Sequence, residues 1–246
     1  MWQKIKKEID FTIFVPTILI IVILTALIVS NPERATGLVN GLMSAITGNF
    51  SWLILGVNFA TLAFLLWLAF GKYKNVKLGD EKPEFSTFSW IAMLFCGGIG
   101  VSIMYWGAIE WAFYVQTPPF GVEPFSAEAF EWASAYGMFH WGPGAWAFYC
   151  LCGIPIAYVC YVRRKPVIRL SAACEGILGK HTEGFWGKAI DVFSLVGLLG
   201  GIATALGLGT PLVTAGLADI FGVPDSFATQ MIVIMVWVVA FGMSTY

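Results

Sequence analysis

Long apolar runs follow one another along almost the whole chain. A helix needs about 20 apolar residues to cross the hydrocarbon core of a bilayer. The segments that reach this length are residues 11–30, 51–70, 88–115, 132–162, 185–218 and 226–246. The pattern therefore predicts six membrane-spanning helices, of which the third, fourth and fifth are long enough to tilt or break.

The composition indicates the same class of protein. Hydrophobic residues make up 58% of the chain and charged residues 12%, whereas soluble domains carry roughly 25% charged residues. We therefore expect an all-α integral membrane protein whose main partner is the lipid bilayer. The net charge of −1 gives no indication of a nucleic-acid partner.

Basic residues gather on alternate connections between the apolar runs. Thirteen of the 14 lysines and arginines precede the first run, follow the second, or lie between the fourth run and the first turn of the fifth, which contains Lys188. The other connections hold only Arg34. Since cytoplasmic loops of membrane proteins are enriched in lysine and arginine, we expect a multi-pass protein of the inner or plasma membrane with its N-terminus in the cytoplasm.

The third apolar run contains three glycines in four positions, within Cys96-Gly97-Gly98-Ile99-Gly100. One interpretation is tight packing between helices, for which small residues are typical. The other is a locally unwound helix whose carbonyl groups bind a cation or a substrate. Glu110 follows near the outer end of the same run, and for it we favour a structural or gating role over direct contact with a ligand.

The fourth run contains Trp141, Trp146 and Tyr149 around a Gly-Pro-Gly sequence, far from either expected membrane surface. Trp146 and Tyr149 are three residues apart and share a helix face. On a continuous helix Trp141 lies about 80° from Tyr149, and Pro143 can kink the helix and bring the rings together. Aromatic faces attract quaternary ammonium ions. The trio therefore predicts an aromatic box for such a cation.

Parts of an enzyme are not recognisable in the sequence. There is no Ser/His/Asp or Cys/His arrangement and no His/Glu cluster with metal-ligand spacing. We therefore expect neither enzymatic activity nor a bound cofactor. The five cysteines are expected to be free thiols, and Asp191 is expected to form an ion pair with Lys188 near the membrane surface.

Several of these stretches together carry a resemblance to a known family. They are residues 83–90 (Pro-Glu-Phe-Ser-Thr-Phe-Ser-Trp), the glycine run, Trp106-Gly107 with Glu110, residues 117–121 (Thr-Pro-Pro-Phe-Gly), and Phe139-His140-Trp141 with Trp146 and Tyr149. In these motifs the chain resembles the betaine/carnitine/choline transporter family. The resemblance extends from the first apolar run to the sixth.

The resemblance implies a fold and an assembly. Members have twelve helices, with two inverted repeats of the sodium/amino-acid symporter type preceded by two extra helices, and usually form a homotrimer. Residues 1–87 would then hold a cytoplasmic N-terminus and the two peripheral helices. Residues 88–246 would be the first four helices of the first repeat. The chain would be the N-terminal half of such a transporter, with the second repeat absent.

The resemblance also implies a site. Trp141, Trp146 and Tyr149 would form part of a box around a trimethylammonium group. Gly98 and Gly100 would meet the substrate carboxylate, and the backbone carbonyls near Cys96 and Ile99 would face a sodium ion in sodium-coupled members. The fifth run has Leu198 and Ile202 where such members can place hydroxyl groups. Coupling to Na⁺, coupling to H⁺ and exchange therefore all stay open.

Two functional hypotheses follow. The first is a secondary transporter that imports glycine betaine, choline or carnitine by alternating access. The alternative is a truncated or accessory membrane subunit without transport activity of its own, which the end of the sequence at Tyr246, before a second repeat, would favour.

Overall fold

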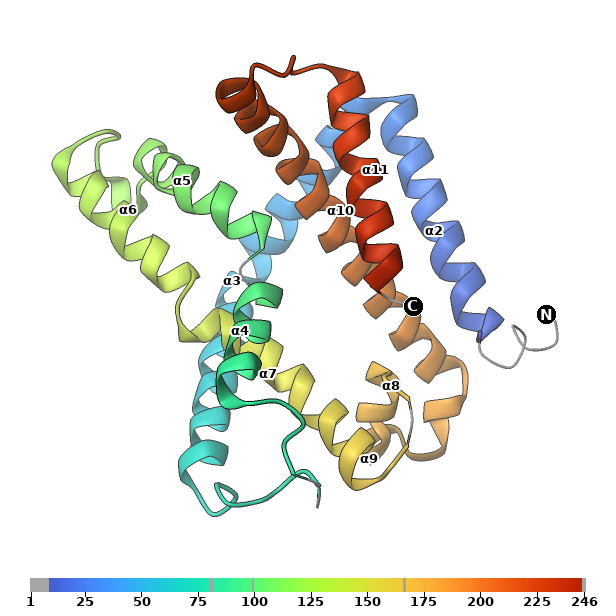
Figure 1. Ribbon diagram of the computed structural model, residues 1–246. Coiled ribbons are helices and arrows are strands. Elements are labelled where there is room, and N and C mark those ends of the chain that lie inside the picture. Colours follow the sequence, from blue (N-terminus) through green and yellow to red (C-terminus); the bar gives the residue numbers. More distant parts are fainter. Residues whose placement is uncertain (1–8, 80–81, 99, 166, 245–246) are drawn as a thin grey trace. The chain divides into compact units, whose positions relative to one another are not determined.

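All regular elements in the described part of the chain are helices (Figure 1). The computed structural model describes residues 9–79, 82–98, 100–165 and 167–244. Four helical stretches are long and apolar enough to cross a membrane, at Phe11–Ser30, Pro32–Phe70, Ala127–Val162 and Phe185–Phe221. The prediction of an all-α, multi-pass membrane protein is confirmed by this architecture.

The first two long helices are joined more tightly than expected. Helix α2 spans Phe11–Ser30 and α3 spans Pro32–Phe70, so that Asn31 is the whole connection. The Asn31 side chain accepts a hydrogen bond from the Arg34 amide at 3.0 Å, and proline is well tolerated in the first turn that follows. The expected loop over residues 31–50 was therefore wrong. Helix α3, at 39 residues, is about 58 Å long.

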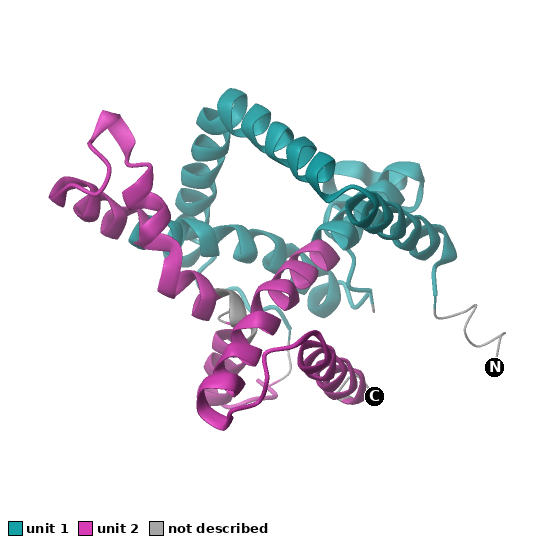
Figure 2. Ribbon diagram, turned by 90° about the horizontal axis from the view of Figure 1, so that it is seen from above, with its two compact units in different colours: residues 1–81, 138–197 teal, residues 82–137, 198–246 magenta. Residues whose placement is uncertain are grey.

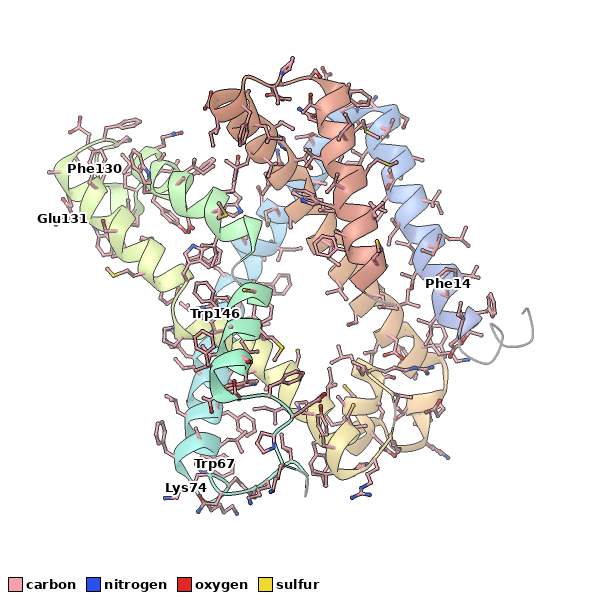
Figure 3. All side chains as sticks on the ribbon, viewed as in Figure 1. Phe14, Trp67, Lys74, Phe130, Glu131 and Trp146 are labelled. Atoms are coloured by element: carbon pink, nitrogen blue, oxygen red, sulfur yellow. The ribbon has the colours of Figure 1, made fainter. Side chains whose placement is uncertain are left out.

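The C-terminal end of α3 has side chains typical of a membrane interface. The Trp67 and Tyr73 rings pack edge to face, with their centroids 5.2 Å apart, and the Lys72 ammonium lies 4.9 Å from the Tyr73 ring centroid. Figure 3 shows Trp67 and Lys74 together at this end of the helix. Amphipathic rings and lysines are enriched at headgroup level, so this end of α3 is suited to lie there.

The third apolar run is divided in two at the glycines. Helix α4 spans Thr87–Gly98 and α5 spans Val101–Gln116. Gly100 precedes α5 with an extended backbone (φ −63°, ψ −158°). A helix interruption here agrees with the unwound interpretation of the glycine stretch rather than with one continuous packed helix. Glycine favours it because its helix propensity is about 1 kcal/mol poorer than that of alanine.

The fourth run is also interrupted, at Trp141 and Gly142. Helix α6 spans Ala127–His140 and α7 spans Pro143–Ala157, followed by one π-helical turn at Tyr158–Val162. The predicted kink is therefore a full break, with Pro143 at the start of the new helix. The angle expected between Trp141 and Tyr149 on a continuous helix does not apply, because Trp141 lies in the break.

A compact connection of short helices precedes the helix of the fifth apolar run. It contains α8 (Leu170–Ala173), α9 (Glu175–Leu178) and a 3₁₀ segment at Gly179–Glu183. Glu175 pairs with Arg163 at 2.7 Å and with Lys165 at 2.8 Å. The hydrogen bond from Lys165 is the main reason that the pKa of the Glu175 carboxyl lies below its usual value.

Asp191 anchors this connection to the helix that follows. Its carboxylate is 5% exposed and accepts hydrogen bonds from the Ser171 amide at 2.9 Å and the Ser171 hydroxyl at 2.7 Å. The expected ion pair with Lys188 was wrong. The carboxylate instead satisfies the amide at the start of α8, where backbone N–H groups lack helical partners.

The remaining elements are a 3₁₀ turn at Pro119–Gly121 and two helices, α10 (Phe185–Phe221) and α11 (Phe227–Ser244). Helix α10 matches the fifth predicted span closely. Helix α11 lies within the sixth, whose residues 245–246 are outside the described part.

The chain forms two compact units, coloured separately in Figure 2. Unit 1 comprises residues 1–81 and 138–197, and unit 2 comprises residues 82–137 and 198–246. In unit 1, α3 packs against both α2 and α7. The proposed division into peripheral helices before residue 88 and repeat helices after it stays a prediction.

Candidate functional site

The break between α6 and α7 is held by backbone and indole hydrogen bonds. The Gly142 amide donates to the Phe139 carbonyl at 3.2 Å, and the Trp146 indole Nε1 donates to the Trp141 carbonyl at 3.0 Å. A Cβ atom on Gly142 would lie 2.7 Å from the Met138 carbonyl oxygen. Only glycine fits there without a backbone shift, so the break is built into the sequence.

Two of the three predicted box residues, Trp146 and Tyr149, have neighbouring rings at this break, within unit 1. Their centroids are 5.7 Å apart and the rings are 35° from parallel. Tyr149 is 73% exposed. Trp141 is linked to this pair through its backbone carbonyl, which accepts the Trp146 indole hydrogen bond. Figure 3 labels Trp146 near the start of α7. The face shared by Trp146 and Tyr149 is as the spacing predicted.

His140 precedes the break and is exposed, with its ring 5.1 Å from that of Trp141.

Helix α3 supports the break from the other side, through a residue that the sequence reasoning missed. The Asn58 amide atoms lie 2.7 Å from the position of a Cβ built on Gly144. The neighbouring Phe59 ring lies 6.5 Å from the Phe139 ring. A single amide inside an otherwise apolar run was the available signal, since polar groups are costly in membrane helices.

Glu110 is buried on α5, in unit 2. It is 7% exposed, and one of its carboxylate oxygens accepts a hydrogen bond from the Tyr114 hydroxyl at 2.6 Å. The Tyr114 ring in turn lies 5.4 Å from Tyr136 of α6. The carboxylate thus holds the Tyr114 hydroxyl within α5, and the Tyr114 ring makes the contact with α6, which accords with the structural role favoured for Glu110.

The second half of the hairpin carries a further aromatic contact. Trp111 and Phe130 stack with their ring centroids 6.0 Å apart. Figure 3 shows Phe130 and Glu131 on α6, toward the end that joins α5. The two helices of the hairpin are thus held together by aromatic packing.

The candidate residues for the carboxylate and the ion lie at the other helix break, also in unit 2. Cys96 and Gly98 belong to the last turn of α4, and Gly100 precedes α5. Carbonyl groups in the last turn of a helix lack intrahelical donors. The Gly100 carbonyl lies after that turn and accepts a hydrogen bond from the Ile103 amide at 3.1 Å. Ile99 lies outside the described residues. The predicted substrate and sodium contacts here stay predictions.

Side-chain metal clusters are absent from the described residues, where no group of three or more His, Cys, Asp or Glu could hold an ion. The five cysteines are free thiols in the structure. A sodium site built from backbone carbonyls would not involve these side chains.

One comparison with known proteins covers almost the whole chain. A family model described as BCCT, betaine/carnitine/choline family transporter, matches residues 12–246. The matched segment includes both helix breaks and every described helix from α2 to α11.

Proposed function

The chain belongs to the betaine/carnitine/choline transporter family, and we propose that it imports a trimethylammonium compound such as glycine betaine, choline or carnitine. Members of this family are transporters and not enzymes. The family suggests substrates of the betaine, carnitine and choline type. Import would proceed by alternating access, with one helix bundle rocking against another.

The observation that carries this proposal is the pair of aromatic rings beside the break in unit 1. Trp146 and Tyr149 lie 5.7 Å apart between ring centroids, and the Trp146 N–H is engaged by the Trp141 carbonyl. A quaternary ammonium ion has no N–H to donate, so ring faces are suited to replace its water. Each well-placed ring contributes about 0.5–2 kcal/mol.

Three rings and one carboxylate contact together support an affinity in the micromolar to millimolar range. Three such rings contribute a few kcal/mol, and a micromolar dissociation constant corresponds to about 8 kcal/mol. The remainder would come from the acidic end of the substrate. We assign that contact to Gly98 and Gly100, of which Gly100 directly precedes the first turn of α5, where a helix attracts anions.

A coupling ion is part of the same proposal. The last-turn carbonyls of α4, near Cys96 and Ile99, would coordinate Na⁺ at the negative end of that helix dipole. The alternative is coupling to H⁺ or exchange of one substrate for another. We further propose a homotrimer in the inner or plasma membrane, with the N-terminus in the cytoplasm.

Uptake into liposomes reconstituted with the protein tests the proposal. We expect saturable uptake of radiolabelled glycine betaine, choline or carnitine under an inward Na⁺ gradient, under a proton gradient, or by counterflow. The driving condition identifies the coupling mode. Absence of uptake under all three conditions would favour the alternative of an accessory subunit without transport activity of its own.

A further inference from the structure

Two consecutive residues of α3 contact both sides of the α6–α7 break. The Phe59 ring lies 6.5 Å from the ring of Phe139, just before the break. The Asn58 amide faces Gly144, just after it. These contacts lie within unit 1. One turn of α3 is therefore in a position to set how the two helices meet.

The Asn58–Gly144 approach is closer than ordinary packing. A Cβ on Gly144 would lie 2.7 Å from both Oδ1 and Nδ2 of Asn58, and 3.1 Å from Cγ. Real Cβ atoms essentially never come within 3.0 Å of a neighbour. The amide thus occupies the space that any side chain at position 144 would need.

The Asn58 side-chain oxygen, next to the first turn of α7, is also an acceptor without a hydrogen-bond partner among the described residues. This oxygen, Oδ1, is buried. Leaving such a buried acceptor unpaired destabilises the folded protein. Gly144 lies in the first turn of α7, and the first N–H groups of a helix have no intrahelical acceptor. A small rotation of the Asn58 side chain would let its oxygen accept a hydrogen bond from a backbone N–H of this turn.

We propose that Asn58 is a positioning residue, which fixes the first turn of α7 and thereby the Trp146 ring two residues beyond Gly144. It does so from α3, which the family resemblance places outside the repeats. The effect on substrate affinity rests on the proposed function, whereas the effect on the break does not.

The kinetic test enlarges one side of the Asn58–Gly144 contact and shrinks the other, in the full-length protein reconstituted in liposomes. Gly144→Ala is expected to raise the KM for choline about fivefold, or about 1 kcal/mol, with little change in Vmax, because the added methyl group displaces the amide. Asn58→Ala removes the obstacle, so the double variant should return most of the way to the KM of Asn58→Ala alone.

Matched control variants are available on both helices. Gly153 lies on the same helix as Gly144 but has nothing within 4 Å of its Cβ position. Asn49 lies on the same helix as Asn58, where its amide donates to the Ala45 carbonyl of its own helix. Gly153→Ala and Asn49→Ala should leave the KM unchanged. An equal rise in KM for Gly144→Ala and Gly153→Ala would overturn the proposal.

Hydrogen–deuterium exchange without substrate gives a separate readout. Amides in residues 141–149 should exchange about fivefold faster in Gly144→Ala and in Asn58→Ala, because either change removes the Asn58 amide from its contact with the first turn of α7. If the wild type moves no trimethylammonium compound but both variants show this faster exchange, the proposed function fails and the positioning role stands. If exchange in Asn58→Ala equals the wild type, the positioning role is refuted.

Discussion

The polar edge and the aromatic face of the Trp146 indole make different interactions. Its Nε1 donates to the Trp141 carbonyl across the break, which satisfies the only donor of the side chain. The ring face remains beside Tyr149, whose exposure is 73%. An indole held by its edge can present its face to a cation without reorganising.

Replacement of Trp146 tests this residue directly. Trp146→Ala removes one ring face and the bond to Trp141, so the KM for a trimethylammonium substrate should rise roughly 2- to 30-fold. Trp146→Phe keeps a face and should have a milder effect. Uptake kinetics measure both. Trp186→Ala, at the exposed start of α10, is the control, and equal KM values for Trp146→Ala and wild type would remove Trp146 from the site.

Contacts within one helix could be predicted from the sequence, and contacts between distant residues could not. The Trp146–Tyr149 pair follows from a spacing of three residues. The Asp191–Ser171 bonds and the Asn58–Gly144 approach depend on which helix faces meet, and no local pattern encodes that. Asp191 therefore received the wrong partner, and Asn58 went unnoticed.

At the level of elements, the chain places its helix breaks with glycine and proline. Both breaks fell inside apolar runs where those residues cluster, so both could be anticipated. The end of α2 at Ser30 was anticipated too, but the helical conformation of residues 31–50 was not, because Gly37, Gly41 and Gly48 lower the helix propensity of that stretch. A proline in a first turn starts a helix as readily as it ends one.

Gly142 is the position where the break tolerates no side chain. In Gly142→Ala the new Cβ would meet the Met138 carbonyl at 2.7 Å and the Phe139 carbonyl at 3.2 Å. Since these are backbone atoms, we expect a loss of about 1–3 kcal/mol in stability, measured as a lower melting temperature of the purified protein. Gly153→Ala on the same helix should not lower it. A Gly142→Ala protein that melts with the wild type would refute the described geometry.

The connection around Glu175 should respond to acid. Its carboxyl pKa is lowered from 4.5, first by the hydrogen bond from Lys165. A carboxyl whose pKa is lower in the folded state than in the unfolded state stabilises the protein above pH 4.5, the unfolded pKa. This stabilisation is lost as the pH falls through the folded pKa. The melting temperature of Glu175→Gln should thus lie below that of the wild type at pH 7, and the difference should shrink below pH 4.5 and vanish once the pH is below the lowered pKa of the folded state. A difference that persists in acid would contradict this assignment.

At the scale of the whole molecule, the distribution of charge predicts the orientation in the membrane. A cytoplasmic fluorescent reporter fused after Gly79 should fluoresce, and a phosphatase that is active only outside the cytoplasm should work when fused after Gly121. Basic residues near helix ends are held on the cytoplasmic side. The opposite pattern of activity would invert the proposed topology.

Recognition of a quaternary ammonium charge by aromatic faces is the central claim of this account, and its most direct test compares two ligands of the same shape. Choline and 3,3-dimethylbutan-1-ol differ in the charged nitrogen that replaces a carbon atom. We predict that choline binds the purified protein at least about tenfold more tightly, or about 1.4 kcal/mol, and that Trp146→Ala narrows the difference. Equal dissociation constants for the two ligands would show that the site does not recognise the cation.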